Sequence, residues 1–564
     1  MRPPVLFGMV FIMGLLAPTP PPYDPLELAK RPFTERARMV CESWALQGYG
    51  TPLAIYFVYA LKVALYIAGW AWFCQFTPGL GSITAISSWW LDPVAFQKAI
   101  LWSMLFEVLG LGCGSGPLTG RYYPPIGGFL YFLRPGTTKM PLFEGLPVVG
   151  GIRRTWLDVA LYGAVVTSLF LALMTSHPAF DEFLPILVLV PLLGMCDKTI
   201  FLAARSEHYW TTIVCFSFAT QWIAGAKAVQ LALWFWAGVS KLNAHFPTVV
   251  AVMTSNGPFT RAPWIRKRMY RNFPDDLRPS RLAVWMAHGG LLLELGVPLV
   301  LLLSPGGTSL VIGMILMLML HGYITSNVPM GVPIEWNFMV VYGAFALFWA
   351  HPEVTVLDIG PWPVAVFLVC ALIGLPLLGN LVPSAISFLL AMRYYAGNWA
   401  YSVWLFRQGS HTKLEKLTKS SVWVTDQLER FYDHRTAVGL VSKVLAFRLM
   451  HLHGRALGIL IPKAVDHYEN YEHVDGEIVA GLVLGYNFGD GHLHRDQLLR
   501  AVQAQCQFAP GELRCVFVEA QPLGRRTLEW SIFDAHTGLV QKGEVTAQEL
   551  LERQPWESKI EEPR

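Results

Sequence analysis

Charged residues are scarce in this chain: they make up 15% of its 564 residues, whereas soluble domains usually carry about a quarter. The net charge of +4 gives no electrostatic support for nucleic-acid binding. The eight cysteines are scattered without a CxxC pair, so neither a disulfide framework nor a zinc site is indicated. The opening apolar run of about 13 residues is too short to span a bilayer and lacks a clean signal-peptide cleavage site, and both Met1 and Met13 are compatible starts.

Long apolar runs, in contrast, recur from Leu53 to Met392, and hydrophobic residues make up 54% of the chain. Each of these runs of 18 or more mostly apolar residues is long enough to cross a hydrocarbon core of about 30 Å at about 1.5 Å per residue. We therefore predict an all-α polytopic membrane bundle of about nine to ten transmembrane helices, followed by a small α+β cytoplasmic domain. The candidate spans are 53–76, 94–114, 157–176, 184–204, 208–225, 227–243, 282–303, 308–326, 336–350 and 362–391.

The segment from Tyr209 to Asn243 decides the topology, because it is either one long helix or a hairpin broken near the sequence QWIAGAKA. Basic residues favour the cytoplasmic side of short loops. They gather in the N-terminal segment, in the loop 115–156, after Lys241 and beyond the last span. Three other loops contain no Lys or Arg: 77–93, 177–183 and 351–361. Only the hairpin puts every basic loop on one side, so we predict ten crossings of the cell membrane with both termini in the cytoplasm.

The chain divides into four predicted regions. These are an N-terminal cytoplasmic or interfacial segment (1–50), the transmembrane domain (51–392), an amphipathic linker helix (393–432) and a small α+β soluble domain (433–564). In the last region, EIVAGLVLGYNF (477–488) and LRCVFVEA (513–520) are expected to be strands and RDQLLRAVQAQC (495–506) a helix. The segment 527–545 is expected to form a β-hairpin that turns at Thr537-Gly538.

Ionisable residues inside apolar spans are costly, and they usually face the bundle interior or a cavity. Lys62, Lys98 and Lys227 lie near span ends, so we expect them to extend to the lipid head groups. Glu107 and Glu294 lie deeper, where an internal ion pair with a lysine is the commonest arrangement.

The hairpin also makes Lys241 a candidate functional residue, because it returns Lys241 to the level of His208. In one straight helix the two would lie about 50 Å apart, at about 1.5 Å per residue. With Asp197 and Lys198 in the preceding turn, the hairpin predicts a cluster of one acid, two lysines and one imidazole. Desolvation beside a second cation favours the neutral amine, which can act as a base. Alternatively, the same residues form a polar knot that only locks the helices together.

These residues resemble the membrane domain of vitamin K-dependent gamma-carboxylase and its bacterial relatives, the horizontally transferred transmembrane domain. The similarity is carried by CDKTIFLAARSEHYW and WFWAGVSKLNAHF, which contain Asp197, Lys198, His208 and Lys241. In that family the corresponding lysine is proposed to deprotonate a reduced quinone. The chain differs from the family at Ser240, where a second basic residue is usual. The segments PPPYDP and WALQGYGTP also resemble an uncharacterised actinobacterial transmembrane family, which implies no mechanism.

The resemblance implies a membrane-embedded enzyme of carboxylase or oxidoreductase type, with Lys241 as the base and His208 polarising the substrate or relaying the proton. Its cofactor or substrate would be a reduced quinone of the menaquinone type, or another lipid-soluble molecule held between helices. The other hypothesis is a non-catalytic cell-envelope protein that binds membrane lipids or scaffolds a protein partner through the C-terminal domain. The reaction and the oligomeric state are left open by the sequence.

Weaker motifs complete the sequence interpretation. His492 and His494 in DGHLHRD are more typical of a solvated loop than of a metal site, and His451 and His453 are expected on different faces of a helix. No metal site is therefore predicted. The segment NVPMGVPIEWNF, which includes Glu335, is a candidate edge of a cavity. The tryptophans near span ends fit an interfacial belt: Trp70, Trp72, Trp89 and Trp90.

Overall fold

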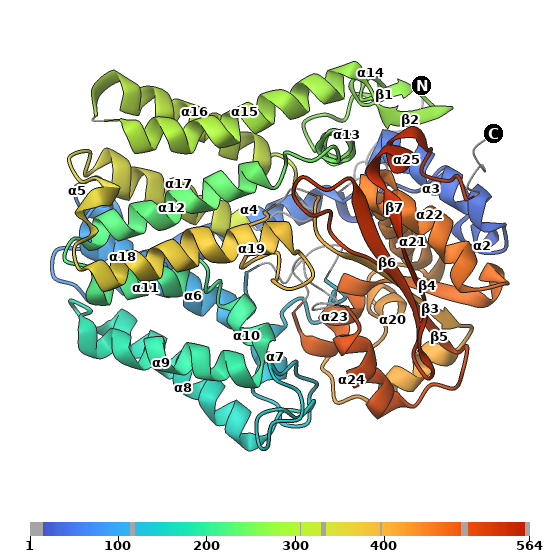
Figure 1. The fold of residues 1–564 in the computed structure, drawn as a ribbon, viewed down its shortest axis with the longest axis horizontal. Helices are drawn as coiled ribbons and strands as arrows, with labels where there is room; N and C mark the ends of the chain where they lie inside the picture. Colours follow the sequence, from blue (N-terminus) through green and yellow to red (C-terminus); the bar gives the residue numbers. More distant parts are fainter. Residues whose placement is uncertain are drawn as a thin grey trace, which may run out of the picture.

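The computed structural model describes residues 15–112, 119–304, 306–328, 334–394, 397–486 and 495–558. It consists of a helical bundle and, at one end of that bundle, a second body built from a β-sheet and helices of both the N-terminal and the C-terminal part of the chain (Figure 1). The helices that open and close the described chain, α2 and α25, both belong to this second body. The chain therefore enters and leaves the bundle at the same end.

The bundle contains a helical segment for each of the ten predicted spans, and successive segments run back and forth along one direction (Figure 1). These segments are α4 (Leu53–Cys74), α6 (Pro93–Val108), α8 (Trp156–Met174), α9 (Phe180–Cys196), α11 (Tyr209–Phe218), α12 (Trp222–Val239), α15 (Arg281–Leu303), α16 (Gly307–Thr325), α17 (Ile334–Gly343) with a π-helical continuation (Ala344–Trp349), and α18 (Trp362–Val369) continued through Cys370–Gly374 into α19 (Leu375–Leu381). Shorter elements lie in the connections: α5 (Ile86–Trp89), α7 (Gly128–Phe132), α10 (Lys198–Ala203), α13 (Phe246–Asn256), α14 (Pro263–Arg268) and the hairpin β1 (Tyr270–Asn272) and β2 (Asp276–Pro279).

Five helices in the described part of the chain are long and apolar enough to cross a membrane: α4, α8, α15, α16 and the continuous helix α18–α19. A sixth is obtained only if the bent pair α21–α22 is counted as one span. The other segments are shorter or more polar; α11, for example, has 10 residues. A helical membrane protein is therefore confirmed, whereas the count of nine to ten crossings stays a prediction.

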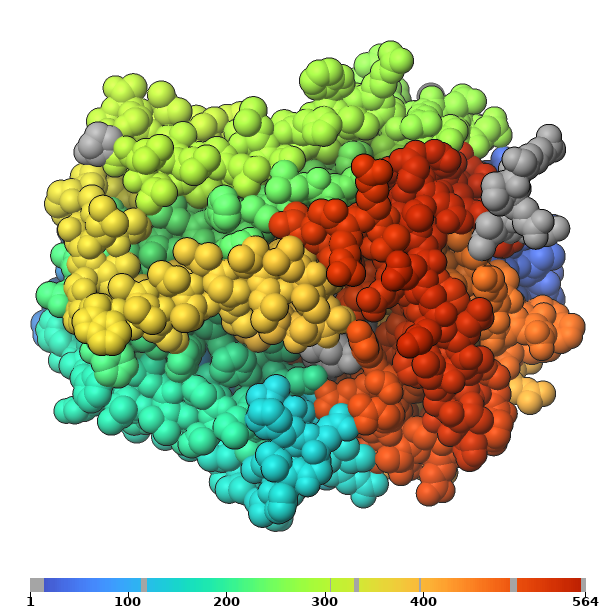
Figure 2. All heavy atoms as spheres, in the orientation of Figure 1, coloured from blue at the N-terminus to red at the C-terminus, as the bar shows by residue number. Residues whose placement is uncertain are grey.

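The long helices expose apolar side chains on their surface, whereas a soluble protein buries most of them. Only 11% to 33% of the residues in their most apolar windows are buried. Large apolar side chains point outwards instead, such as Phe57 of α4 at 70% exposure and Leu292 of α15 at 74%. A continuous exposed apolar surface of this kind marks contact with lipid. In Figure 2, α18–α19 lies on this surface between α15–α16 and α8–α9, and the C-terminal sheet closes one end.

The hairpin predicted between Tyr209 and Asn243 is confirmed. Helix α11 ends at Phe218, Ala219 adopts an extended conformation, and α12 begins at Trp222. Gly360 packs against this turn with φ +98°, and a Cβ there would lie 2.6 Å from Oγ1 of Thr220. The connection between α11 and α12 therefore needs a glycine on the neighbouring loop, and α12 runs back beside α11.

The second body is built on an antiparallel sheet with the strand order β4-β3-β5-β6-β7. Helices α21 and α22 pack on the sheet, and α2 and α3 pack on α21. Residues of the predicted N-terminal segment thus belong to the same body as the C-terminal domain. The elements are α2 (Pro25–Leu28), α3 (Phe33–Gln47), β3 (Tyr401–Arg407), α20 (Val424–Leu428), α21 (His434–Met450), α22 (Leu452–Ala464), β4 (Tyr471–Asp475), α23 (Gly476–Leu484), α24 (Gln497–Cys506), β5 (Leu513–Val518), β6 (Thr527–Asp534), β7 (Gly538–Thr546) and α25 (Ala547–Glu552).

Two local predictions for this body are wrong. The sequence predicts a strand over 477–488, but the chain forms α23 there: Asp475 caps its N-terminus and Gly485, at φ +77°, ends it. Because α23 is buried along its whole length, its apolar run has no helical period that the sequence could show. The predicted linker helix is also wrong: the described residues of 393–432 form β3, a 3₁₀ helix (Ser410–Lys416) and the short helix α20. In contrast, α24, β5 and the β6–β7 hairpin are confirmed.

One buried ion pair ties α21 to β4, and its removal gives a test of this body. The guanidinium of Arg448 contacts Asp475 at 2.5 Å and Glu477 at 3.3 Å, and its side chain is 2% exposed. We expect Arg448→Met to lower the free energy of unfolding by about 3–5 kcal/mol, because two buried carboxylates lose their cation. The matched control is Arg407→Met at the exposed end of β3, which should change it by less than about 0.5 kcal/mol. Amide exchange of β3 and β4 measures both; equal protection in the two variants would show that the pair is dispensable.

Candidate functional site

Lys241 lies just beyond the C-terminus of α12 and forms a buried ion pair with Glu294 in the middle of α15. The Lys241 Nζ to Glu294 Oε1 distance is 2.6 Å, and the two residues are 4% and 5% exposed. Nζ also donates to the backbone oxygens of Ala237 and Tyr394, each at 3.2 Å. All three ammonium protons therefore have an acceptor. The ion pair expected for Glu294 is present.

Glu294 itself is less well satisfied than its partner. Its Oε2 atom is buried and has no hydrogen-bond partner in the described part of the chain. Helices α12 and α15 approach closely at this point: a Cβ on Gly238 would lie only 2.7 Å from the Leu295 side chain. A buried carboxylate with one unsatisfied oxygen is costly, so it is a place where a ligand, a proton or water gains most from binding.

A second polar contact lies on the α16 side of the same region. The Trp234 indole donates to Nε2 of His321 at 2.8 Å, and Nδ1 of His321 lies 2.8 Å from Oδ1 of Asn337. Because Nε2 accepts, the proton of a neutral His321 sits on Nδ1 and is donated to Asn337. The three residues join α12, α16 and α17 on the side of α12 that also carries Lys241.

His208 is brought into the same buried region, but it does not contact Lys241 directly. Its ring is 2% exposed and lies 6.2 Å from the ring of Trp336. Trp336 packs in turn against Tyr394 at 4.9 Å, and Tyr394 accepts from Lys241 through its backbone oxygen. The Tyr394 hydroxyl donates to Oε1 of Glu207 at 2.5 Å. Tyr394 and Trp336 therefore connect the two predicted residues.

Asp197 and Lys198 have a different environment from the one expected. The Asp197 carboxylate pairs with Arg154 and accepts from the backbone N–H groups of Met140 at 3.2 Å and Thr199 at 3.1 Å. It thereby caps α10 and holds the loop before α8. The backbone N–H of Lys198 donates to the Met140 oxygen at 2.8 Å. The acid beside Lys241 is Glu294 instead. The contacts of Asp197 hold helices and loops together, as in the alternative hypothesis of a purely structural cluster.

Further charged residues continue this buried region towards α4 and α6. Arg205 lies 3.9 Å from both Glu107 and Glu207, and Lys62 lies 3.3 Å from Glu335. We use the term buried network for the ionisable residues joined in this way and the residues that connect them. Its members are Lys62, Glu107, Arg205, Glu207, His208, Lys241, Glu294, His321, Glu335, Trp336 and Tyr394.

Two lysines outside the buried network, Lys98 and Lys227, donate to backbone oxygens. Lys98 donates to the backbone oxygens of Phe73 and Leu173, at the C-terminal ends of α4 and α8. Lys227 donates to the backbone oxygens of His351 and Val354. The expectation that these two lysines extend to the head groups is therefore wrong, because free carbonyls at helix and loop ends lie within their reach.

A histidine cluster that the sequence interpretation missed lies between the bundle and the sheet. His453 packs 5.5 Å from the ring of His245 and 5.7 Å from that of Tyr401, which His451 also contacts. The expected continuous helix is broken at His451, where α21 and α22 meet at 112°, so His451 and His453 face the same tyrosine. No group of three or more His, Cys, Asp or Glu in the described ranges could hold a metal ion. His492 and His494 lie outside these ranges.

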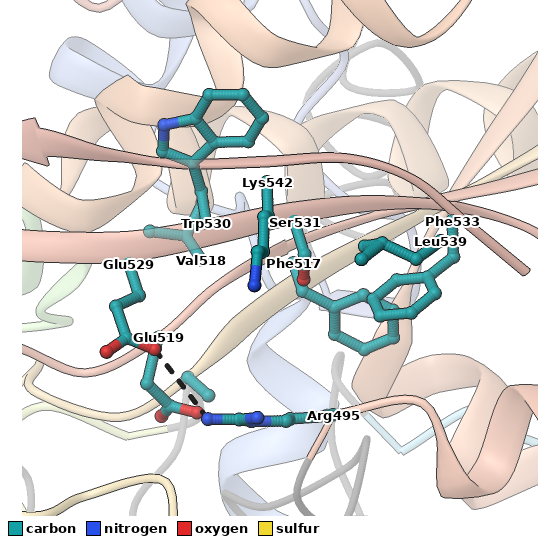
Figure 3. A pocket seen from close by; sticks show the side chains of 11 residues that line it. Arg495, Phe517, Val518, Glu519, Glu529, Trp530, Ser531, Phe533, Leu539 and Lys542 are labelled. Atoms are coloured by element: carbon teal, nitrogen blue, oxygen red, sulfur yellow. Dashed lines mark ion pairs between the residues drawn. The ribbon is translucent and has the colours of Figure 1, made fainter.

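A shallow hollow of about 180 Å³ lies on the outer face of the sheet (Figure 3). Arg495 and Glu529 form an ion pair of 3.7 Å at its edge, and both side chains are more than half exposed. Exposed pairs of this kind contribute little to stability or binding. The remaining lining is a mixture of apolar and polar side chains, so the hollow has no converging chemistry and does not compete with the buried network as a candidate site.

The fold and the buried network define an integral membrane protein with a helical bundle and a mixed α/β body at one end. The chain belongs to the family described as "Transmembrane protein of unknown function (DUF3556)", whose model matches residues 13–564. No curated protein and no solved structure matches the chain. The resemblance to the carboxylase membrane domain is not confirmed by these comparisons and stays a prediction.

The contribution of the central ion pair can be measured with a double-mutant cycle. We expect Lys241→Met and Glu294→Leu each to lower the free energy of unfolding in detergent by about 3–5 kcal/mol, because each leaves one uncompensated buried charge. The double variant should lose much less than the sum, since both charges are then gone. Lys227→Met, at the other end of α12, is the matched control for loss of an intramembrane lysine. Additive losses would show that Lys241 and Glu294 are not coupled.

Proposed function

We propose that the protein is a membrane-embedded enzyme that uses the Lys241–Glu294 pair to remove a proton from a lipid-soluble substrate. The observation that carries this proposal is the 2.6 Å ion pair, which is almost completely buried and continues into the buried network. Intramembrane ionisable residues are expensive and by default mark functional positions. The resemblance at His208 and Lys241 favours a quinol, of the menaquinone type, over other lipid-soluble substrates.

The geometry suggests how the pair would act. In the resting pair Lys241 is an ammonium and Glu294 a carboxylate; at 2.6 Å the proton can pass to Glu294, which leaves a neutral amine. The amine takes the proton of a substrate hydroxyl and becomes an ammonium again, while the substrate becomes an anion. The Tyr394–Glu207 hydrogen bond, next to His208, supplies a second branch along which a proton can move.

Mass spectrometry of small molecules that co-purify with the protein tests this proposal. A redox lipid or other hydroxyl-bearing lipid should be retained by the wild type and should differ in amount or oxidation state in Lys241→Met. Lys227→Met, in α12 but outside the buried network, should resemble the wild type. Only bulk phospholipid in all three preparations, with no altered metabolite, would overturn the enzymatic assignment.

One observation favours a second candidate function, a non-catalytic lipid-binding or scaffold protein. All three protons of the Lys241 ammonium already have acceptors, so the pair can serve as a lock between α12 and α15. In addition, β7 is the last strand of the described sheet, and Leu539 and Val540 are each 50% exposed on it. A free strand edge can pair with a protein partner. On this hypothesis Lys241→Met changes stability but no metabolite.

The proposed location is the cell membrane, with both termini in the cytoplasm. This follows from the loops without Lys or Arg, one of which carries Leu357 at 90% exposure. In a Cys370→Ser background, which removes the one exposed thiol among the described cysteines, Leu357→Cys should react with a membrane-impermeant maleimide in intact cells. Lys542→Cys on β7 should react only after permeabilisation. The opposite pattern would invert the proposed orientation.

A further inference from the structure

An apolar cavity of about 360 Å³ lies between α4, α5, α6 and α17. Six aromatic side chains form most of its wall: Tyr66, Trp70, Trp90, Trp102, Phe338 and Tyr342. Ile67 and Phe338, at its rim, are 38% and 40% exposed on the lipid-facing surface. Trp70 and Trp90 thus line a cavity, whereas the sequence predicts for them a place in an interfacial belt of tryptophans. A pocket of this size and lining is suited to a small hydrophobic molecule that enters sideways from the bilayer.

The helix faces that line the cavity lead to the buried network. On α4, Lys62 lies one turn before Tyr66. On α17, Glu335 lies one turn before Met339. Residues four apart lie on the same side of a helix. On α6 the same face runs from Ala99, which lines the cavity, through Ser103 to Glu107.

Along α4 and α6, a hydrogen-bonded pair of side chains lies between the cavity and these charges. The Tyr66 hydroxyl is bonded to the hydroxyl of Ser103, and the Trp102 indole donates to the Tyr66 backbone oxygen at 2.8 Å. Beyond this pair the carboxylates of Glu107 and Glu335 converge on Gly112, where a Cβ would lie 2.2 Å from one and 2.8 Å from the other. The Tyr66 hydroxyl is therefore a polar group of the cavity wall on the side of the two carboxylates.

Among the described residues, the buried network holds more carboxylates than cations. Within the described residues it contains three cations (Lys62, Arg205, Lys241) and four carboxylates (Glu107, Glu207, Glu294, Glu335). One oxygen each of Glu207, Glu294 and Glu335 is buried without a hydrogen-bond partner in those residues. The Glu335 side chain is 3% exposed. A molecule that brings hydrogen-bond donors or a positive charge would satisfy these oxygens.

We propose that this cavity binds the apolar part of a lipid-soluble molecule whose head group carries hydrogen-bond donors, hydroxyl or ammonium, and that the head group reaches Glu335. This inference deepens the proposed function, on which it rests for the identity of the reacting site, because it names the class of molecule that meets the buried network. The aromatic wall holds the apolar part, and the carboxylate oxygens select the head group against anionic lipids such as fatty acids.

The test compares three probes with one chain length and different head groups. The full-length protein in lipid nanodiscs receives dodecylamine, dodecanol or dodecanoate at the same mole fraction, and the midpoint of thermal unfolding, Tm, is measured. We expect dodecylamine and dodecanol to raise Tm by several degrees and dodecanoate to leave it unchanged, because only the first two heads can donate to carboxylates. Equal shifts with all three probes would overturn the proposal in favour of a bulk-lipid effect.

Variants locate the effect. Ile67→Trp fills the rim of the cavity at an exposed position and should abolish the shifts, whereas Leu302→Trp, equally lipid-facing on α15 at 46% exposure, should keep them. Glu335→Gln should keep the dodecanol shift and lose the additional shift of dodecylamine. Identical behaviour of the two Trp variants, or an unchanged amine preference in Glu335→Gln, would overturn the proposed site. Because binding needs no turnover, failure here and failure of catalysis at Lys241 are separate results.

Discussion

The turn between α11 and α12 is the constraint on which the rest of the bundle depends. It occupies three residues, Ala219 to Gln221, and is held by the close approach of Gly360 to Thr220. If the helix ran straight through, Lys241 would lie about 50 Å from His208 at about 1.5 Å per residue. With the turn, Lys241 returns to the region where the residues after α10 present Arg205, and α15 and α17 present Glu294 and Glu335. The place of Lys241 in the buried network therefore follows from one short break in an apolar segment.

The two ends of the bundle use intramembrane charge in different ways. At the end away from the sheet, Lys98 and Lys227 donate to backbone oxygens that the helices leave free. These contacts complete the hydrogen bonding of helix and loop ends, and no acid is involved. At the end near the sheet, cations meet carboxylates, and several carboxylate oxygens have no donor in the described residues. A purely structural role would favour the first arrangement, because it leaves fewer unsatisfied buried groups. The second arrangement is where function is expected.

Those parts of the fold and of the candidate site that depend on local sequence signals could be predicted from the sequence. The basic loops predicted the hairpin, Lys241 stood out as a lysine at the end of an apolar run, and the Thr537-Gly538 pair marked the β6–β7 turn. Partners could not be predicted in the same way, because Glu294 and Tyr394 are 53 and 153 residues away from Lys241 along the chain. The prediction that Asp197 lies beside Lys241 failed for the same reason: Asp197 pairs with Arg154, which belongs to a loop distant in the sequence.

The surplus of carboxylates links the candidate base to the cavity. A buried acid without a donor either takes up a proton or binds a donor, since an uncompensated charge in a low-polarity interior is too costly. The Oε1 atom of Glu335 is buried and has no hydrogen-bond partner in the described residues. If a hydroxyl group donates to it, the same hydroxyl lies among residues that continue through Arg205 and Glu207 to Tyr394 and Lys241. Head-group recognition at α17 and proton removal at α12 are then two ends of one polar path.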